Sequence, residues 1–395
     1  MKEGWEYKRL KDVATFTRGL TYSKNDEVEI SNNIVLRSNN VDLSTGKLNF
    51  DELKYLRPDF SIPEEKKVKK GSLLMCMSNG SKIHLGKVAL INKDFSYAFG
   101  GFMALVTPNQ ELNPQFFHYS LSSPEYKDFI KKLSEGANIN NIKVKELELF
   151  TIPIPPLSEQ QRIVDYLDSA FAKIDAMKAN AEKALNETKA LFQASLKEML
   201  EPKEGWEEKK MSSLYDVRDG THDSPKYQDK GYPLVTSKNL KGGILDMSNV
   251  NFISESDYKA INSRSKVDIG DVLFAMIGTI GNPVYVEEEP NYAIKNMALF
   301  KVPREQSGEF LRYYLLNNII LSKMQSEAKG TTQKFVSLGY LRNFLISIPP
   351  LSEQQSIVAT LDSLKSKVDR LQENYNKISQ ECDALKQAIL RQVFE

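Results

Sequence analysis

Two carboxylates and a lysine in residues 58–66 have the types needed for a nuclease site. Pro58-Asp59 is followed by Glu64 and Lys66, and a cluster of this composition can hold Mg²⁺ and position an attacking water. The spacing, however, is too tight for a strand hairpin between the two parts of the cluster. We therefore do not expect catalysis from this segment.

Other catalytic patterns are also incomplete. Residues 80–88 read GSKIHLGKV, with one residue too many between the glycines of a phosphate-binding loop and with Val88 in place of the metal-binding hydroxyl. His222 could act as a general base, but no Ser or Cys nucleophile arrangement accompanies it. The other cysteines and histidines are not spaced as the ligands of a metal site. They are Cys76, Cys382, His84 and His118. We expect a non-catalytic chain without a cofactor of its own, whose chemistry belongs to partners.

The chain contains one phrase twice, which indicates an internal duplication. Residues 154–164 read IPPLSEQQRIV and residues 348–358 read IPPLSEQQSIV. The prolines hold the preceding isoleucine extended and prevent a helix from entering the phrase. Two pairs match the Ser-x-x-Gln capping box, Ser158 with Gln161 and Ser352 with Gln355. Each phrase is therefore predicted to end a domain and to begin a helix.

The two helices are predicted to be long and to pair with each other. No Gly or Pro occurs from Glu159 to Glu201 or from Glu353 to Glu395. Apolar or small residues recur in both segments at alternating steps of three and four, as in a coiled-coil seam. The expected seam is Ile163, Leu167, Ala170, Ile174, Met177, Ala181, Ala184, Thr188, Leu191 and Ser195 against Ile357, Leu361, Leu364, Val368, Leu371, Tyr375, Ile378, Cys382, Leu385 and Ile389. Because domain termini usually lie close together, the helices should run antiparallel.

Each helix follows a globular domain of mixed type. Gly4-Trp5-Glu6 opens the first domain and Gly205-Trp206-Glu207 opens the second. Short β-type runs alternate with turns, and longer runs favour helices. The expected strands are 33–36, 72–77, 87–91, 271–276 and 293–301, and the expected helices are 115–132 and 308–329. We predict an α+β fold with two mixed α/β domains in tandem, divided as 1–152, 153–201 (helix), 202–346 and 347–395 (helix).

Composition limits the class of protein. With 395 residues, 41% hydrophobic and 27% charged, the chain is long enough for two domains with cores of their own. Two cysteines suit a reducing compartment, and neither a signal peptide nor an apolar run of about 20 residues is present, so we expect a cytoplasmic protein without membrane contact. A net charge of +1 does not by itself indicate a nucleic-acid binder.

These features together resemble the specificity subunit of type I restriction-modification systems, over the whole chain. The motifs involved are the repeated IPPLSEQQ, the Gly-Trp-Glu openings, GTHDSPKYQDKGYPLVTSKNLKGG from Gly220 and VDIGDVLFAMIGTIG from Val267. The resemblance implies two target-recognition domains, a helical spacer, a bipartite site on double-stranded DNA and two copies of a DNA adenine methyltransferase subunit. It also implies a nuclease/translocase subunit, with ATP, Mg²⁺ and S-adenosylmethionine held by the partners.

The residues themselves agree with this resemblance. A direct repeat closed by an antiparallel helix pair is a pseudo-two-fold object, which suits two copies of one partner and the pseudo-dyad of duplex DNA. Polar donors beside glycines are candidates for contacts with bases and phosphates. In the first domain they are Thr17, Arg18, Thr21, Arg37, Ser38, Asn40, Ser78, Asn79, Ser81 and Lys82. In the second domain they are Arg218, Thr221, His222, Lys226, Thr236, Ser237, Lys238, Asn239, Lys295, Asn296, Lys329, Thr331, Thr332 and Gln333.

The sequence thus predicts a DNA-recognition subunit that selects an asymmetric bipartite sequence. Two other classes stay open at this point. A self-sufficient restriction endonuclease would cut DNA as a purified chain with Mg²⁺. A coiled-coil scaffold without DNA contact would fail a gel shift both with and without the methyltransferase, although loops rich in Arg, Asn, Ser and Thr argue against it.

Overall fold

The structure is a computed structural model that describes residues 4–135, 141–330 and 334–395. It divides into two compact units: one holds the chain up to residue 180 together with 376–395, and the other holds 181–375. Each long helix therefore contributes one part to each unit, whereas the sequence placed the boundaries at the helix ends. Within the described residues, no helix combines the length and apolar character needed to cross a bilayer.

The first unit contains two four-stranded sheets and a two-stranded ribbon. The larger antiparallel sheet has the order β2 (Ala14–Arg18), β9 (Met103–Pro108), β6 (Leu73–Cys76) and β7 (Val88–Leu90). The second sheet has the order β3 (Glu27–Val28), β5 (Lys54–Leu56), β4 (Asn33–Leu36) and β8 (Ala98–Phe99). The ribbon pairs β1 (Glu6–Arg9) with β10 (Thr151–Ile154). Since Ile154 pairs with Glu6, the start of the domain lies beside the strand that leads into the long helix.

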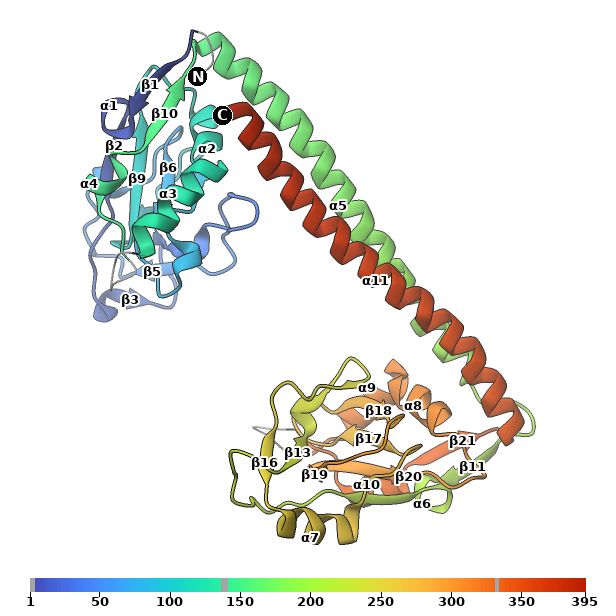
Figure 1. Ribbon diagram of the computed structural model, residues 1–395. Helices are drawn as coiled ribbons and strands as arrows, with labels where there is room; N and C mark the ends of the chain where they lie inside the picture. The colour runs from blue at the N-terminus through green and yellow to red at the C-terminus, as the bar shows by residue number, and fades with distance from the viewer. Residues whose placement is uncertain (1–3, 136–140, 331–333) are drawn as a thin grey trace. The chain divides into compact units, whose positions relative to one another are not determined.

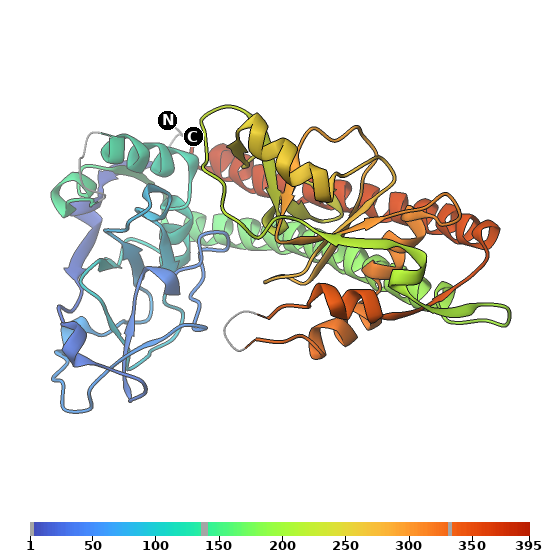
Figure 2. The same cartoon turned by 90° about the horizontal axis from the view of Figure 1, so that it is seen from below.

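Helices cover the larger sheet of the first unit. They are α1 (Leu10–Val13), α2 (Pro114–Ser120), α3 (Pro124–Glu135) and α4 (Val144–Leu147). Short 3-10 turns lie at Lys24–Asp26, Ser38–Asn40, Glu64–Lys66 and Lys82–His84. Figure 2 shows α3 (teal) and the smaller sheet (blue) on opposite sides of this unit.

The second unit repeats this plan. Its larger sheet has the order β12 (Asp216–Asp219), β20 (Met297–Lys301), β17 (Val272–Ala275) and β18 (Gly281–Tyr285). Its second sheet is β16 (Asn251–Ile253), β13 (Tyr232–Thr236) and β19 (Ala293–Lys295), and its ribbons pair β11 (Glu207–Lys210) with β21 (Leu345–Ile348) and β14 (Leu240–Lys241) with β15 (Ile244–Leu245). The helices are α6 (Met211–Leu214), α7 (Glu255–Ser265), α8 (Gly308–Leu316), α9 (Asn318–Ser326) and α10 (Leu338–Asn343), with a 3-10 turn at Ser237–Asn239.

Several predicted elements are confirmed, and three are broken in two. The strands at 33–36, 72–77, 87–91 and 271–276 are present as β4, β6, β7 and β17 within one or two residues. The strand predicted over 293–301 splits into β19 and β20, because Asn296 takes a left-handed conformation with φ +55°. The predicted helices 115–132 and 308–329 are each two helices, interrupted near Leu121 and at Asn317.

The two long helices are α5 (Leu157–Met199) and α11 (Leu351–Phe394). In the first unit, the Lys178 ammonium lies 3.2 Å from the Asp383 carboxylate and the Lys386 ammonium lies 2.5 Å from that of Asp175. As the residue number rises along α5, the partner's number falls along α11, so the predicted antiparallel pairing is confirmed; Figure 1 shows the two helices (green and red) side by side. In the second unit, Lys189 donates to Gln372 over 2.6 Å.

The predicted seam is correct at every second position of α5 and shifted by one residue at the others. Leu167 and Ile174 are buried as expected, but Met177 and Leu191 are 59% and 67% exposed. Leu185 and Phe192 are buried instead. The sequence did not distinguish the predicted seam from the shifted one, because small residues at 170 and 184 fit the apolar spacing as well as their larger neighbours.

The helix ends pack into the domain cores. In the first unit Leu390 and Phe394 of α11 join Val164 and Leu167 of α5 in the core, and the Phe394 ring lies 5.3 Å from the ring of Phe116. Burying one such phenylalanine contributes roughly 2 kcal/mol. The second unit repeats the arrangement with Phe192 and Leu196 of α5 and with Ile357 and Leu361 of α11.

The predicted capping boxes are wrong. Ser158 and Ser352 lie inside the first turn, which begins at Leu157 and Leu351. The N–H groups of Glu159 and Gln160 donate to the Pro156 carbonyl, and those of Glu353 and Gln354 donate to the Pro350 carbonyl. The helices therefore begin directly after the prolines, one residue before the serines that the sequence assigned as caps.

The repeated phrase instead supplies a buried glutamine that joins helix and domain. Gln160 Nε2 donates to the carbonyls of Glu111 and Pro155, and its Oε1 accepts from the backbone N–H of Asn113, all at 2.8 Å. Gln354 does the same in the second unit: it donates to Pro349 and accepts from Ser307, the N-cap of α8, as Asn113 is of α2. Both glutamines are at most 1% exposed.

Candidate nucleic-acid interface

The candidate residues of the first unit gather at one edge of its larger sheet. Arg18, the last residue of β2, pairs with Ala104, and Cys76, the last residue of β6, pairs with Met103. The ends of β2 and β6 therefore meet the start of β9. Leu36, at the end of β4, pairs with Phe99 and brings a fourth segment to the same edge.

The second unit has the same edge. Asp219 at the end of β12 pairs with Ala298, and Ala275 at the end of β17 pairs with Met297. Thr236 at the end of β13 pairs with Lys295. Loops after these three strands converge on Asn296, where β19 gives way to β20.

A glycine makes each edge possible. A Cβ built at Gly19 would lie 2.0 Å from the carbonyl oxygen of Gly100, and one built at Gly220 would lie 2.4 Å from that of Ile294. No side chain fits at such separations, so glycine is required for the backbones to approach. The approach places the loop after β2 beside the turn at 100–102, and the loop after β12 beside 294–296.

In the first unit the approach brings Thr21, Arg37 and Ser38 together. A Cβ at Gly101 would lie 3.7 Å from Thr21 Oγ1, and one at Gly100 would lie 3.8 Å from Arg37 Cγ. Asn79 Nδ2 donates to Ser38 Oγ over 2.8 Å, and the Cys76 thiol donates to the same oxygen over 3.3 Å. Burial raises the pKa of that thiol, so it is a neutral part of the scaffold.

Five other predicted residues lie in the same strand ends and loops. Thr17 is half-buried in β2 and Arg18 is exposed, with the Arg18 carbonyl accepting from Lys66 Nζ over 2.8 Å. The Ser78 N–H donates to the Phe102 carbonyl, and the Ser81 N–H donates to Asn79 Oδ1. Lys82 is exposed, but its ammonium donates to the Ser134 carbonyl over 2.9 Å.

Asn40 and Asn239 do not present their amides at the edge. Asn40 is 1% exposed, accepts from the Arg37 N–H and donates to the carbonyls of Asn49 and Glu52. Asn239 is 6% exposed and bonds in the same way to Thr236 and to the carbonyls of Asp246 and Asn249. Because these amides are saturated inside their own turns, both residues shape the loop, contrary to the expectation that they contact bases.

In the second unit the edge is formed by Thr221, His222, Ser237, Lys295 and Asn296. His222 Nδ1 lies 2.9 Å from Asn296 Oδ1, and Ser237 Oγ donates to the Asn296 carbonyl over 2.9 Å. The Asn296 N–H donates to the Thr221 carbonyl over 3.1 Å. Lys295 is buried and its ammonium lies 2.6 Å from Ser224 Oγ, so it braces the loop from beneath.

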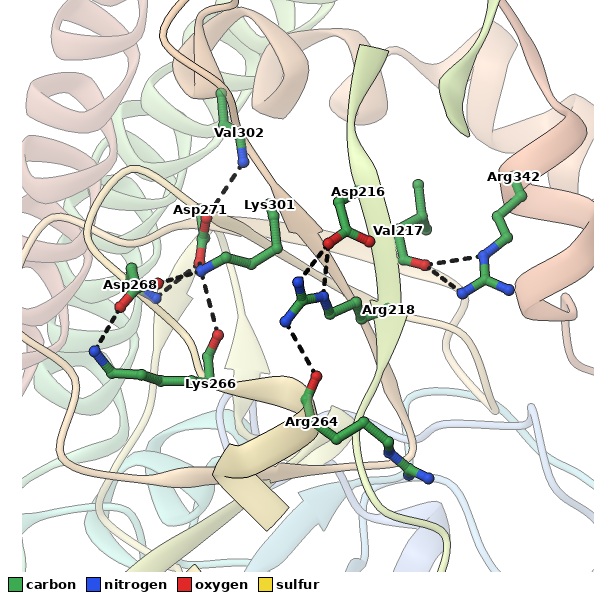
Figure 3. A network of polar contacts seen from close by, with 10 residues as sticks. All are labelled: Asp216, Val217, Arg218, Arg264, Lys266, Asp268, Asp271, Lys301, Val302 and Arg342. Carbon is green, nitrogen blue, oxygen red and sulfur yellow. Dashed lines mark hydrogen bonds and ion pairs between the residues drawn. The ribbon is translucent and has the colours of Figure 1, made fainter. Parts of the chain in front are cut away.

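Arg218 has partners outside this group, as Figure 3 shows. Its guanidinium pairs with Asp216 across 2.5 Å and donates to the Arg264 carbonyl over 3.2 Å. The hydrogen bond with Asp216 raises the pKa of Arg218. In the same view the Lys301 ammonium lies 2.5 Å from the carboxylates of both Asp268 and Asp271, which ties β20 to the turn before β17. The network fixes the flank of the sheet.

The remaining predicted residues are of three kinds. Lys226, Lys238 and Lys329 are exposed, and Thr236 is half-buried, with its hydroxyl bonded to Asn239. The Lys329 backbone exchanges both hydrogen bonds with Phe335, and the Gly278 N–H donates to the Lys334 carbonyl. Thr331, Thr332 and Gln333 lie outside the described residues.

Two edge residues were missed in the sequence. Phe102 is 71% exposed directly before β9, at the place that Asn296 occupies before β20. Asp219 accepts from His222 over 2.8 Å. The aromatic after Gly100-Gly101 was a usable signal, since an exposed phenylalanine in a glycine turn has no core to fill.

The nuclease pattern at 58–66 is dispersed. Asp59 pairs with Arg57, Glu64 pairs with Lys67 over 2.7 Å, and Lys66 reaches back to the Arg18 carbonyl. Across the described ranges, no three His, Cys, Asp or Glu side chains form a group that could hold a metal ion.

The two repeats match a known sequence family. The family model of the type I restriction modification DNA specificity domain matches residues 2–187 and 203–380. The chain belongs to this family. It is a type I specificity subunit, as the repeated motifs predicted, and such subunits are the non-catalytic components of restriction-modification enzymes.

Relatives of the specificity subunit span its full length. It is 27% identical to the type I restriction enzyme EcoKI specificity subunit of Escherichia coli K12, over 100% of this chain and 89% of that one. It is also 27% identical to the StySPI specificity subunit of Salmonella potsdam, with the same coverage.

Solved structures share the fold. One described as the structural basis underlying complex assembly and conformational transition of the type I R-M system has a TM-score of 0.77, with 21% identity over 100% of this chain and 98% of that one. The crystal structure of the HsdS subunit from Thermoanaerobacter tengcongensis has a TM-score of 0.54, with 21% identity over 100% and 97%.

Proposed function

We propose that this specificity subunit selects an asymmetric, bipartite sequence on double-stranded DNA, with one sheet edge for each half-site. The observation that supports this is a repeated scaffold with unequal edges. Gly19 and Gly220 make the same close approach in both units. The residues displayed there differ: Arg18 in the first loop corresponds to Asp219 in the second, and Phe102 corresponds to Asn296. Edges of different chemistry select different bases.

The residues that we assign to DNA contact are the accessible ones. In the first unit they are Arg18, Thr21, Arg37, Ser38, Ser78, Asn79, Ser81, Lys82 and Phe102. In the second unit they are His222, Lys226, Ser237, Lys238, Asn296 and Lys329, whereas Thr221 is buried and shapes the loop. The contacts predicted at Thr331, Thr332 and Gln333 lie outside the described residues and stay predictions. Arginine and lysine suit phosphates and guanine edges, and hydroxyl and amide groups suit the other base edges. Phe102 can stack on a base or fill space against a thymine methyl.

The subunit also docks two copies of a DNA adenine methyltransferase subunit, and through them a nuclease/translocase subunit. Two copies suit the molecule because each unit repeats the same junction between helix and domain, at Gln160 and at Gln354. The type I relatives are named as specificity subunits of restriction enzymes, which are multisubunit assemblies. The site of action is the cytoplasm, where the DNA is.

The methyltransferase subunits contribute most of the DNA affinity. The chain has a net charge of only +1, and phosphate contacts by many cations dominate protein–DNA affinity. A gel shift at physiological salt, with and without the methyltransferase, tests this part. Tight site-specific binding by the isolated chain would contradict it.

Methylation mapping tests the proposal as a whole. The chain is co-expressed with its methyltransferase in a host without other adenine methylation, and methylated adenines are located by single-molecule sequencing. We expect one interrupted sequence whose two halves differ. A palindromic or uninterrupted site would refute the assignment of one half-site to each edge, and cleavage of DNA by the purified chain with Mg²⁺ would favour a nuclease instead.

A further inference from the structure

His222 lies between two side chains, and each presents a hydrogen-bond acceptor to one of its ring nitrogens. Its Nε2 faces Asp219 Oδ2 at 2.8 Å, and its Nδ1 faces Asn296 Oδ1 at 2.9 Å. The carboxylate and the amide oxygen both accept hydrogen bonds. A neutral imidazole has one N–H donor and one acceptor nitrogen, whereas the imidazolium has two donors.

The arrangement therefore favours a doubly protonated ring. Asp219 can only accept, so Nε2 has to bear a proton. With Nδ1 also protonated, Asn296 turns its oxygen towards the ring and its NH₂ group away. With Nδ1 deprotonated, the oxygen would face a lone pair, and the amide has to rotate so that Nδ2 donates to Nδ1. The protonation state of His222 thus determines which end of the Asn296 amide points out of the edge.

The backbone of Asn296 stays fixed during such a rotation. Its N–H is held by the Thr221 carbonyl and its carbonyl by Ser237 Oγ. Its φ of +55° is a conformation that asparagine tolerates better than most residues. Within the described residues we find no hydrogen bond from Asn296 Nδ2 to another group, so that end of the amide is available to a ligand.

The surrounding charges favour the imidazolium. Hydrogen bonds with Asn296 and with Asp219 raise the pKa of His222, against the opposing effects of partial burial and of Arg264 at the end of α7. The ammonium of Lys295, from β19, is held by Ser224 in the same loop. The other two histidines behave oppositely, because burial lowers the pKa of both His84 and His118.

We propose that Asp219 and His222 are positioning residues that set the hydrogen-bonding polarity of Asn296, so that the second half-site is selected in a proton-dependent way. This inference rests on the proposed DNA-recognition function. With the imidazolium, Asn296 offers N–H donors, which suit guanine O6 and N7, adenine N7 or thymine O4. With the neutral ring it offers an acceptor, which suits the amino group of adenine or cytosine.

The first unit has no counterpart of the Asp219–His222–Asn296 arrangement, so it serves as an internal control. Arg18, Thr21 and Phe102 occupy the places of Asp219, His222 and Asn296. None of these three side chains is a histidine. Any change of base preference with pH that arises from this proton exchange is therefore confined to the second half-site.

The first experiment measures the proton without DNA. NMR of the full chain labelled in its three histidines follows the ring signals across about pH 5 to 9, a range that brackets the ordinary histidine pKa. We expect one histidine to titrate above its ordinary range and two below, with His222→Gln removing the first. Asp219→Asn should move that titration to lower pH. A His222 that titrates at or below the ordinary range, or that ignores Asp219→Asn, would overturn the proposal.

The second experiment measures base preference. The complex with methyltransferase selects from DNA in which both half-sites are randomised, at about pH 6 and about pH 8.5, on either side of a raised histidine pKa. We expect the preference at one position of the second half-site to change by roughly fivefold or more, the ratio of one hydrogen bond made or lost. His222→Gln should abolish the change. Asn296→Asp, which offers only acceptors, should keep the high-pH preference at both pH values.

Asn296→Gly controls for folding, since glycine accepts the same φ and removes only the amide. It should erase the preference at that position at both pH values and leave the first half-site intact. A pH-dependent change in the first half-site of similar size, or one that survives His222→Gln, would refute the inference. If neither half-site showed any sequence preference, the proposed function would itself be wrong, and the assignment of Asn296 to a base would be overturned with it.

Discussion

Replacing Gln354 by Met should destabilise the second unit by far more than a conservative change at a surface position. The side chain is 1% exposed and makes three hydrogen bonds. Its Oε1 accepts from the Ser307 N–H at 2.9 Å, and its Nε2 donates to the Pro349 carbonyl and to Gln306 Oε1 at 2.9 and 3.0 Å. Methionine has a similar volume but satisfies none of these groups.

The magnitude follows from the groups left behind. Each neutral hydrogen bond contributes about 1 kcal/mol net, and a buried donor or acceptor left without a partner costs about 1–3 kcal/mol. The Ser307 N–H and the Pro349 carbonyl lose a buried partner, whereas Gln306 can turn to solvent. We expect a loss of about 2–4 kcal/mol in the free energy of unfolding. With a urea slope of about 3 kcal/mol per molar, the midpoint should fall by about 1 M.

The fluorescence of Trp206 measures the unfolding of the second unit. Its indole N–H donates to Glu353 over 3.1 Å beside the glutamine, and the chain has only one other tryptophan, Trp5, in the first unit. In a Trp5→Phe background, fluorescence during urea unfolding reports on the second unit. The matched control is Gln355→Met, the exposed neighbour in the same phrase, which should change stability by less than about 0.5 kcal/mol. Equal midpoints for Gln354→Met and Gln355→Met would refute the assignment of the repeated glutamine to the junction.

Three further outcomes follow from the structure. Asn239→Ala should lower the melting temperature, because a buried amide with three backbone partners is lost, and should weaken the whole second half-site in methylation mapping; relaxed preference at a single base with unchanged stability would contradict this. Burial lowers the pKa of His118 to about 4, so the stability of the first unit should be complete above the ordinary pKa of about 6.5 and should fall as the pH drops towards 4, by up to roughly 3 kcal/mol; Trp5 fluorescence should show a flatter profile in His118→Gln, and an identical profile would contradict it. Gly220→Ala should push the second edge apart at the Ile294 carbonyl and abolish selection in that half-site alone, which mapping of both halves would detect; loss of both halves or of neither would contradict it.

The overall architecture could be predicted because its signals are local and repeated. The phrase IPPLSEQQ occurs twice, and both helices lack glycine and proline, so duplication, helix length and antiparallel pairing follow from the sequence. The prediction failed where two nearby side chains fitted the local sequence pattern equally well. Ser158 matches a capping box, but the helix already begins at Leu157. Gln160, two residues further on, is buried because of contacts with Glu111 and Asn113 that no local pattern reveals.

The sequence singled out loops that the structure brings to two sheet edges, but it did not distinguish the accessible residues of those loops from the buried ones. Polar residues beside glycine occur in most of the loops that meet at the two sheet edges, and their contact with DNA stays a prediction. Which side chains are accessible depends on the turn. Asn40 and Thr21 look equivalent in sequence, yet Asn40 is buried and bonded to its own loop whereas Thr21 is exposed. The role of Asn296 depends on a break in a strand that the sequence alone favours as continuous from 293 to 301.

The same buried contacts recur in both halves while the edges differ, and this separation has a physical consequence. Tyr119 donates to Asp168 in the first unit and Tyr313 donates to Asp362 in the second, on the same helices as the two buried glutamines. Substitutions at such buried, hydrogen-bonded positions are costly, whereas substitutions at exposed loop positions away from special features usually change stability by less than about 0.5 kcal/mol. The same scaffold therefore carries Arg18 before Gly19 in the first unit and Asp219, of opposite charge, before Gly220 in the second. The free energy that holds an edge in place comes from residues that do not select the bases, so each half-site can change independently of the fold.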